Sequence, residues 1–153
     1  MPDDRHLLTD VRLVLRDSRL RPVYEVAIDE RRVPTQPRPL QDLGTVDGRD
    51  NLGQAVIVRL LTPRGELAAL GHADYGSRLH ELVGQRNTET VRHLVKLYIL
   101  ESLHAEPRIE KVERLRVQPA PGTRDRVNVE LTVKPVGPAE TVTIGPFSLE
   151  LGS

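Results

Sequence analysis

The chain has 153 residues, no cysteine, and 22 basic residues balanced by 22 acidic ones, so its formal net charge is zero. This length fits one domain with room for an extension. Zero net charge excludes a general electrostatic attraction to nucleic acid or to an anionic membrane, and we expect neither as a partner. The absence of cysteine excludes disulfides, thiolate metal sites and thiol nucleophiles. No apolar run reaches the roughly 18–20 residues of a membrane span.

Residues 1–45 have the pattern of an N-terminal β and extended arm. Apolar and polar residues alternate in 11–15 and again in 24–28, which is typical of half-buried strands. Turn-forming residues between the two segments predict a β-hairpin. A proline-rich linker follows, with Pro34, Pro37 and Pro39. We therefore expect two parts, an arm over 1–45 and a second domain over 46–153.

The second part opens with helical signals. After a turn, Asn51 is suited to cap a short helix over 52–61. Apolar residues lie on nearly every face of this predicted helix, which indicates deep burial. The proline and glycine that follow predict its end. A further short helix is expected over 77–83, before a glycine.

The strongest periodic segment is 88–104, where Thr88 is the expected N-cap. Its apolar face is a stripe at helical spacing, formed by Val91, Leu94, Val95, Tyr98, Ser102 and Leu103. Leu97 and Leu100 lie off this stripe. We therefore expect the C-terminal half of the helix to contact neighbours on more than one side.

The C-terminal third returns to β structure. Alternation predicts strands over 109–117 and 127–133, and a last strand over 140–151 that is interrupted at Gly145 and Pro146. The predicted fold class is α+β, with a mainly antiparallel sheet from the C-terminal third packed on two or three helices.

Patterns for catalysis or cofactor binding are missing. The histidines do not form the H-E-x-x-H zinc arrangement, although His93 and His104 share the longest predicted helix. No serine has the context of a hydrolase nucleophile, and no glycine-rich phosphate loop occurs. We expect no catalytic residue, metal or cofactor. The alternative is a cell-wall (peptidoglycan) glycosidase that uses paired carboxylates, although four aromatic residues offer few platforms for sugars.

Glu106, Pro107 and Arg108 end the longest helix. In one interpretation they form an exposed turn with solvated charges. In the other, the rigid φ of Pro107 presents Glu106 and Arg108 in a set geometry. A planar guanidinium pairs bidentately with carboxylates, so the second interpretation predicts a fixed protein–protein joint.

Four motifs occur in a characteristic order: Asp47-Gly48, Leu61-Thr62-Pro63-Arg64-Gly65-Glu66, Asp74-Tyr75-Gly76-Ser77-Arg78-Leu79 and Glu106-Pro107-Arg108-Ile109. Over about residues 42–135 this order resembles the baseplate-wedge family of gene product 25 and tail protein W. Relatives in that family occur in contractile phage tails, type VI secretion systems and extracellular contractile injection particles. Residues 1–45 lie outside the resemblance, which leaves the type of particle open.

The resemblance implies a structural protein without enzymatic activity. Family members sit as six copies in a baseplate, join the larger wedge subunits and nucleate the contractile sheath, near tube and hub proteins. By carry-over, Glu106, Pro107 and Arg108 would form the joint with the wedge core. Strand docking of the sheath would involve the C-terminal strands, through Val127, Val129, Leu131, Val142, Ile144 and Leu149. The chain would assemble in the bacterial cytoplasm as part of a tail-like particle.

Overall fold

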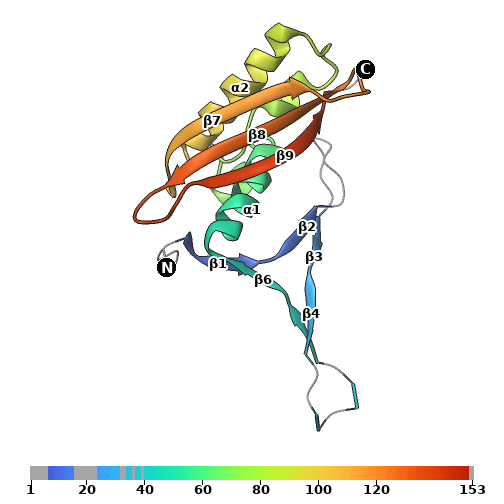
Figure 1. Ribbon diagram of the computed structural model, residues 1–153, viewed down its shortest axis with the longest axis vertical. Helices are drawn as coiled ribbons and strands as arrows, with labels where there is room; N and C mark the ends of the chain where they lie inside the picture. Colours follow the sequence, from blue (N-terminus) through green and yellow to red (C-terminus); the bar gives the residue numbers. More distant parts are fainter. Residues whose placement is uncertain (1–6, 16–23, 32–33, 36, 39, 152–153) are drawn as a thin grey trace.

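The computed structural model describes residues 7–15, 24–31, 34–35, 37–38 and 40–151. Two α-helices and a three-stranded C-terminal sheet form the body, and short strand pairs form the N-terminal part (Figure 1). The predicted α+β class with an N-terminal hairpin is confirmed. Across these ranges, no helix is both long and apolar enough to cross a membrane.

The body is built on an antiparallel sheet with the order β7 (Ile109–Pro119), β8 (Arg126–Pro135) and β9 (Val142–Glu150). Side chains of β8 alternate between the core and the outer face. The core side of the sheet packs on the helices, which lie behind it in Figure 1. The last strand continues through Gly145 and Pro146, where its register with β8 is irregular.

Helix α2 (Glu89–His104) begins where the sequence predicts. The Thr88 side chain accepts a hydrogen bond from the Val91 backbone N–H, which confirms it as the N-cap. The predicted stripe packs into the core, where Val95 and Ile99 are fully buried. The expectation for Leu97 and Leu100 is wrong, because they are 55% and 43% exposed and face away from the core.

Helix α1 (Gly48–Leu61) begins earlier than predicted. Its N-cap is Asp47, whose side chain makes no capping hydrogen bond. Asn51 is instead buried in the first turn, where its amide donates to the backbone carbonyl of Leu7 at 3.0 Å. This long-range bond removes Asn51 from the capping role that its residue type favours locally. The helix predicted over 77–83 is a single 3-10 turn, η3 (Leu79–Leu82), and another such turn is η2 (Ala68–Leu70).

The N-terminal part consists of three two-stranded antiparallel ribbons. They pair β1 (Thr9–Val11) with β6 (Thr45–Asp47), β2 (Leu13–Leu15) with β3 (Tyr24–Val26), and β4 (Ile28–Arg31) with β5 (Leu40–Leu43). The pairing of β2 with β3 is the predicted hairpin, and its turn lies outside the described residues. Pro34 and Pro37 lie in the loop between β4 and β5, and Pro39 is outside the described residues.

The three ribbons meet at a junction with a closed cycle of backbone hydrogen bonds. Arg12 donates to Gly44, Gly44 donates to Ala27, and Ala27 donates to Arg12, at 2.7 to 2.9 Å. A Cβ at Gly44 would approach Ala27 to 3.1 Å, so the junction favours the smallest side chain. Each strand therefore changes partner at this point, and the boundary expected at 45/46 falls inside β6.

Gln54 attaches this junction to helix α1. Its side-chain amide accepts a hydrogen bond from the Leu13 backbone and donates one to the Val11 carbonyl, both at 2.8 Å. The glutamine thereby satisfies the backbone donor and acceptor on either side of Arg12, where β1 ends and β2 begins.

We expect Gln54→Ala to loosen the ribbons from α1, because one backbone N–H and one C=O lose their partners. The loss should be about 1–2 kcal/mol in local stability. Hydrogen exchange measured by mass spectrometry should quicken in 9–15 but not in α2. Gln85→Ala, at an exposed loop position, is the matched control. Unchanged exchange in 9–15 would show that Gln54 does not hold the junction.

Candidate protein–protein joint

The predicted joint residues form the turn between α2 and β7. The backbone N–H of Glu106 donates to the Leu103 carbonyl, and that of Ile109 donates to the Glu106 carbonyl. Pro107 is exposed at the outside of this turn, whereas the side chain of Glu106 is only 4% exposed. The turn therefore presents Pro107 outward and directs the carboxylate of Glu106 inward.

The Glu106 carboxylate lies between two guanidinium groups. Its Oε1 accepts hydrogen bonds from Nε of Arg108 at 2.7 Å and from the Arg108 backbone at 3.3 Å. Its Oε2 lies 3.4 Å from Nη2 of Arg59, in the last turn of α1. Since Arg59 is also almost fully buried, the two charges compensate each other in the interior. One carboxylate thus links the last turn of α1 to the turn between α2 and β7.

Tyr75 completes this cluster from the loop before η3. The guanidinium of Arg59 stacks over the Tyr75 ring, 4.5 Å from its centroid. Burial raises the pKa of the Tyr75 hydroxyl, and the positive charge of Arg59 opposes this rise. We call Arg59, Tyr75, Glu106 and Arg108 the joint cluster.

Electrostatics keep Glu106 ionised. Burial by itself raises the pKa of this carboxyl, but the hydrogen bond and charge of Arg108, assisted by Arg59, bring the pKa below its ordinary value. A general acid requires the opposite shift, because it must stay protonated near neutral pH. Glu106 is therefore poorly suited to the acid role in glycoside hydrolysis.

Close packing explains the glycine and serine in the motif around Tyr75. Gly76 has φ +105°, and a Cβ there would lie 2.3 Å from the carbonyl oxygen of Thr62, so a larger residue does not fit. Ser77 donates to the Leu60 carbonyl, and Ser102 of α2 donates to the Gly76 carbonyl at 2.8 Å. These bonds hold the loop against both helices and thereby place Tyr75 over Arg59.

A second charged cluster lies beside the first and is more exposed. Arg78 pairs bidentately with Glu81 at 2.9 and 3.0 Å and stacks over Tyr98 at 4.4 Å. Its other guanidinium nitrogen lies 3.7 Å from Glu101, which also binds Arg64 at 2.6 Å. Solvent screens these pairs, so they order the surface more than they stabilise the fold.

An open pocket of about 300 Å³ adjoins the joint cluster. It is lined by Arg59, Gly71, His72, Ala73, Asp74, Tyr75 and Ala105. Both signs of charge and an aromatic ring border it, so it suits an inserted side chain of a protein partner better than a small anion. Among the residues that the structure describes, no group of three or more His, Asp or Glu is placed to hold a metal ion.

The structure brings Glu106 and Arg108 together but gives them unequal roles. The carboxylate of Glu106 is bound by Arg59 and Arg108 of the same chain. Arg108, whose side chain is 23% exposed, is the charged member of the cluster that reaches the surface. Sequence reasoning missed Arg59 and Tyr75. The signal for Arg59 was an arginine inside a helix predicted to be deeply buried, because such a charge requires a buried partner.

The residues predicted for sheath docking lie in the core. Val127, Val129 and Leu131 are fully buried on β8, which is hydrogen-bonded to a strand on both sides. On β9, Leu149 is fully buried, Ile144 is 4% exposed and Val142 is half-buried. Because β8 is central, β7 and β9 are the edge strands of this sheet within the part of the chain that the structure describes, and an added strand would pair with one of them.

Comparisons of the chain with models of protein families, with curated proteins and with solved structures found no match.

We expect Glu106→Gln to lower the free energy of unfolding by about 3 kcal/mol, because Arg59 stays buried without a negative partner. Urea denaturation at pH 7 measures this loss. Glu101→Gln is the matched control, since Glu101 also binds an arginine but is 37% exposed, and should cost less than about 1 kcal/mol. Equal effects of the two substitutions would refute a special role for the buried carboxylate.

The stabilising effect of Glu106 should also depend on pH. Because its pKa is lower in the folded chain, its contribution is complete above the unfolded pKa of about 4.3 and is lost as the pH falls through the folded pKa. The difference in unfolding free energy between wild type and Glu106→Gln should therefore shrink between pH 6 and pH 3. A difference that stays constant over this range would contradict the lowered pKa.

Proposed function

We propose that this chain is a structural baseplate component of a contractile injection machine, which links the wedge core to the first sheath ring and nucleates sheath assembly. The joint cluster is the observation that carries the proposal. It unites α1, the loop with Tyr75 and the turn with Glu106 and Arg108. Two of the motifs on which the family resemblance rests, those with Tyr75 and with Glu106 and Arg108, therefore meet in the cluster, and a third is bonded to its loop through the Ser77 N–H and the Thr62 carbonyl.

The geometry of the cluster suits a permanent joint. A binding residue is most specific when its own conformation is held by neighbouring contacts. Glu106 holds Nε and the backbone N–H of Arg108, so the guanidinium is oriented before a partner arrives. The remaining donors of Arg108 can then bind a carboxylate or carbonyl of a wedge subunit at low entropic cost.

The sheet supplies a second attachment in this proposal. An incoming strand of the sheath protein would pair with β7 or β9, through backbone hydrogen bonds that need no particular side chains. Pro146 has no N–H to offer, and β7 contains two register shifts, so either edge would accept only a short strand. The buried residues of β8 would keep the sheet rigid beneath it.

The proposal predicts that Arg108→Ala folds normally but fails to join a wedge. When it is co-expressed with the wedge and sheath proteins of the proposed particle, co-purification should fall at least tenfold, and electron microscopy should show no complete baseplates. Arg124→Ala is the control, since Arg124 is an exposed arginine in the loop between β7 and β8. Normal particles from Arg108→Ala would refute the joint.

Peptidoglycan cleavage by the wild-type chain, abolished by replacing single acids, would instead support the glycosidase.

A further inference from the structure

The ribbon of β4 and β5 has an apolar face that nothing in the described chain covers. Ile28 and Leu43 are register partners and are 59% and 56% exposed. Val26, two residues before Ile28, is 47% exposed on the same side. Glu30, which is also on this side, accepts a hydrogen bond from the uncharged amide of Gln41 and has no cationic partner among the residues that the structure describes. We call these five residues the ribbon face.

Helix α2 carries a second apolar surface that no residue of the described ranges covers. Leu97 and Leu100 are exposed, and His93 and His104 extend the same side of the helix at spacings of four, three and four residues. This spacing is typical of a helix that binds another element along a seam. Beside the stripe, Lys96 forms no ion pair with any residue that the structure describes. We call Lys96 and these four residues the helix stripe.

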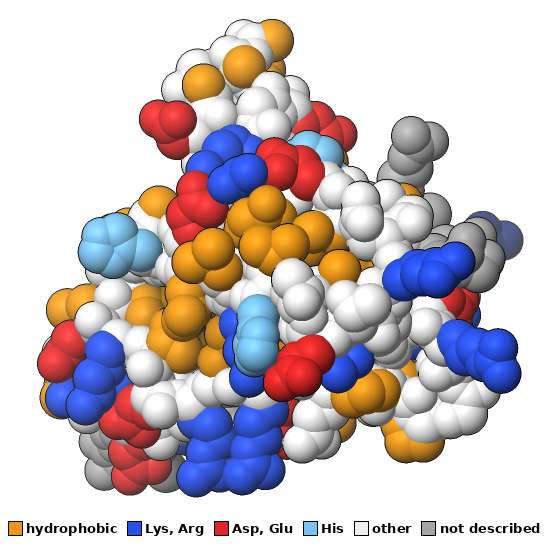
Figure 2. Space-filling model, turned by 90° about the horizontal axis from the view of Figure 1, so that it is seen from above, with side chains coloured by type: hydrophobic (Ala, Val, Ile, Leu, Met, Phe, Trp, Pro, Cys, Tyr) orange, Lys and Arg blue, Asp and Glu red, His pale blue; other side chains and the backbone are white. Residues whose placement is uncertain are grey.

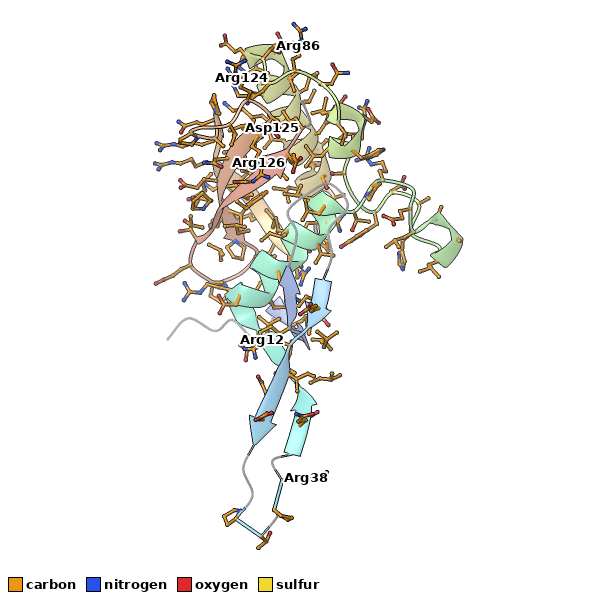
Figure 3. All side chains as sticks on the ribbon, turned by 90° about the vertical axis from the view of Figure 1, so that its right-hand side faces the viewer. Arg12, Arg38, Arg86, Arg124, Asp125 and Arg126 are labelled. Atoms are coloured by element: carbon orange, nitrogen blue, oxygen red, sulfur yellow. The ribbon has the colours of Figure 1, made fainter. Side chains whose placement is uncertain are left out.

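The two surfaces cannot cover each other within one copy. In Figure 1 the ribbon of β4 and β5 extends away from the body, whereas α2 lies at the opposite end behind the sheet. Figure 3 shows the same separation, with Arg38 near the tip of the ribbon and Arg86, just before α2, at the far end.

The surfaces are complementary in length, polarity and charge. The stripe spans about 16 Å along the helix, and the ribbon face spans about 13 Å from Val26 to Glu30. Each offers large aliphatic side chains to the other. Lys96 brings a positive charge and Glu30 a negative one, and neither has an ionic partner within the described chain. An isolated two-stranded ribbon is also marginally stable in water, so covering its apolar face stabilises it.

We propose that the ribbon face of one copy packs on the helix stripe of a second copy. The contact is heterologous, because it joins two different surfaces, so it produces a ring if the rotation between copies closes and a chain if it does not. Leu97 and Leu100 lie against Ile28 and Leu43 of the neighbouring copy, with Lys96 beside Glu30. This contact uses neither the joint cluster nor the sheet edges and does not depend on the proposed function.

The contact is small compared with a permanent interface. Specific interfaces bury about 800 Å² on each partner, and a short ribbon on three turns of helix buries less. We therefore expect a dissociation constant of the order of micromolar, with occupancy favoured where copies are held close together.

Sedimentation velocity over about 1–200 μM tests the contact with variants of exposed residues. The ribbon variant is Ile28→Gln with Leu43→Gln, and the helix variant is Leu97→Gln with Leu100→Gln. Each should sediment as a monomer, at concentrations where the wild type associates. An equimolar mixture should form dimers and nothing larger, since only the intact ribbon of one variant and the intact stripe of the other remain. Val83→Gln with Val136→Gln, at residues 53% and 45% exposed, is the matched control and should associate normally.

The other outcomes overturn the proposal in distinguishable ways. A wild type that stays monomeric at 200 μM shows that the two surfaces do not bind each other. Association lost in only one variant, without recovery on mixing, indicates a symmetric contact through that surface alone. Dimers in the mixture together with normal association of the control support the proposed pairing.

The absence of cysteine allows the register to be tested directly. Leu43→Cys and Leu100→Cys chains, mixed under mild oxidation, should yield a mixed disulfide in preference to either homodimer. Replacing Leu43→Cys by Val136→Cys should remove that preference. A yield of mixed disulfide no greater than with Val136→Cys would overturn the pairing of ribbon and helix.

Discussion

A carboxylate buried between two arginines sets the arrangement of the body. Glu106 can remain ionised in the interior only while Arg59 and Arg108 stay in contact with it, since an unpaired buried charge costs several kcal/mol. Arg59 comes from the last turn of α1, whereas Glu106 and Arg108 both lie in the turn between α2 and β7. Displacing α1 from this turn would separate Arg59 from Glu106, so the ion cluster fixes the end of α1 against the turn.

The same requirement explains the neighbouring loop. Arg59 offers one face of its guanidinium to Tyr75, and that contact needs the loop to pass close to Thr62. Only Gly76 permits this approach, and the hydroxyl of Ser102 holds the loop there by bonding the Gly76 carbonyl. Residues from separate sequence motifs thus pack against one another. Arg108 is the charged member that reaches the surface, and the buried carboxylate of Glu106 holds it there.

Local signals in the sequence predict the positions of helices and strands better than the long-range contacts that their residues make. Alternation located the C-terminal strands, and periodicity with Thr88 located α2, because these features depend on neighbouring residues alone. The residue type of Asn51 predicts an N-cap. Its actual bond to Leu7 joins residues 44 positions apart, and no local pattern reveals such a bond. Likewise, the E-P-R tripeptide predicts a joint, but only the fold shows that Glu106 is buried between Arg59 and Arg108 and that Arg108 is the charged residue that reaches the surface. The exposure of Leu97 was missed because periodicity identifies an apolar face and cannot tell whether a second one is covered.

The zero net charge corresponds to a surface on which charges of both signs are mixed. Figure 2 shows acidic and basic side chains interspersed with hydrophobic ones over one end of the molecule, without a field of a single sign. Such a surface gives little long-range attraction, and its specificity comes from matching individual charges at contact. Isolated surface pairs are weak, and small apolar contacts bind only at micromolar concentrations. Firm attachment through such a surface requires several simultaneous contacts, each raising the effective concentration for the next. In the two proposals such contacts would come from Arg108 with the adjoining edge of β7, from the ribbon face and from the helix stripe, and the ribbon lies at the opposite end of the fold from α2.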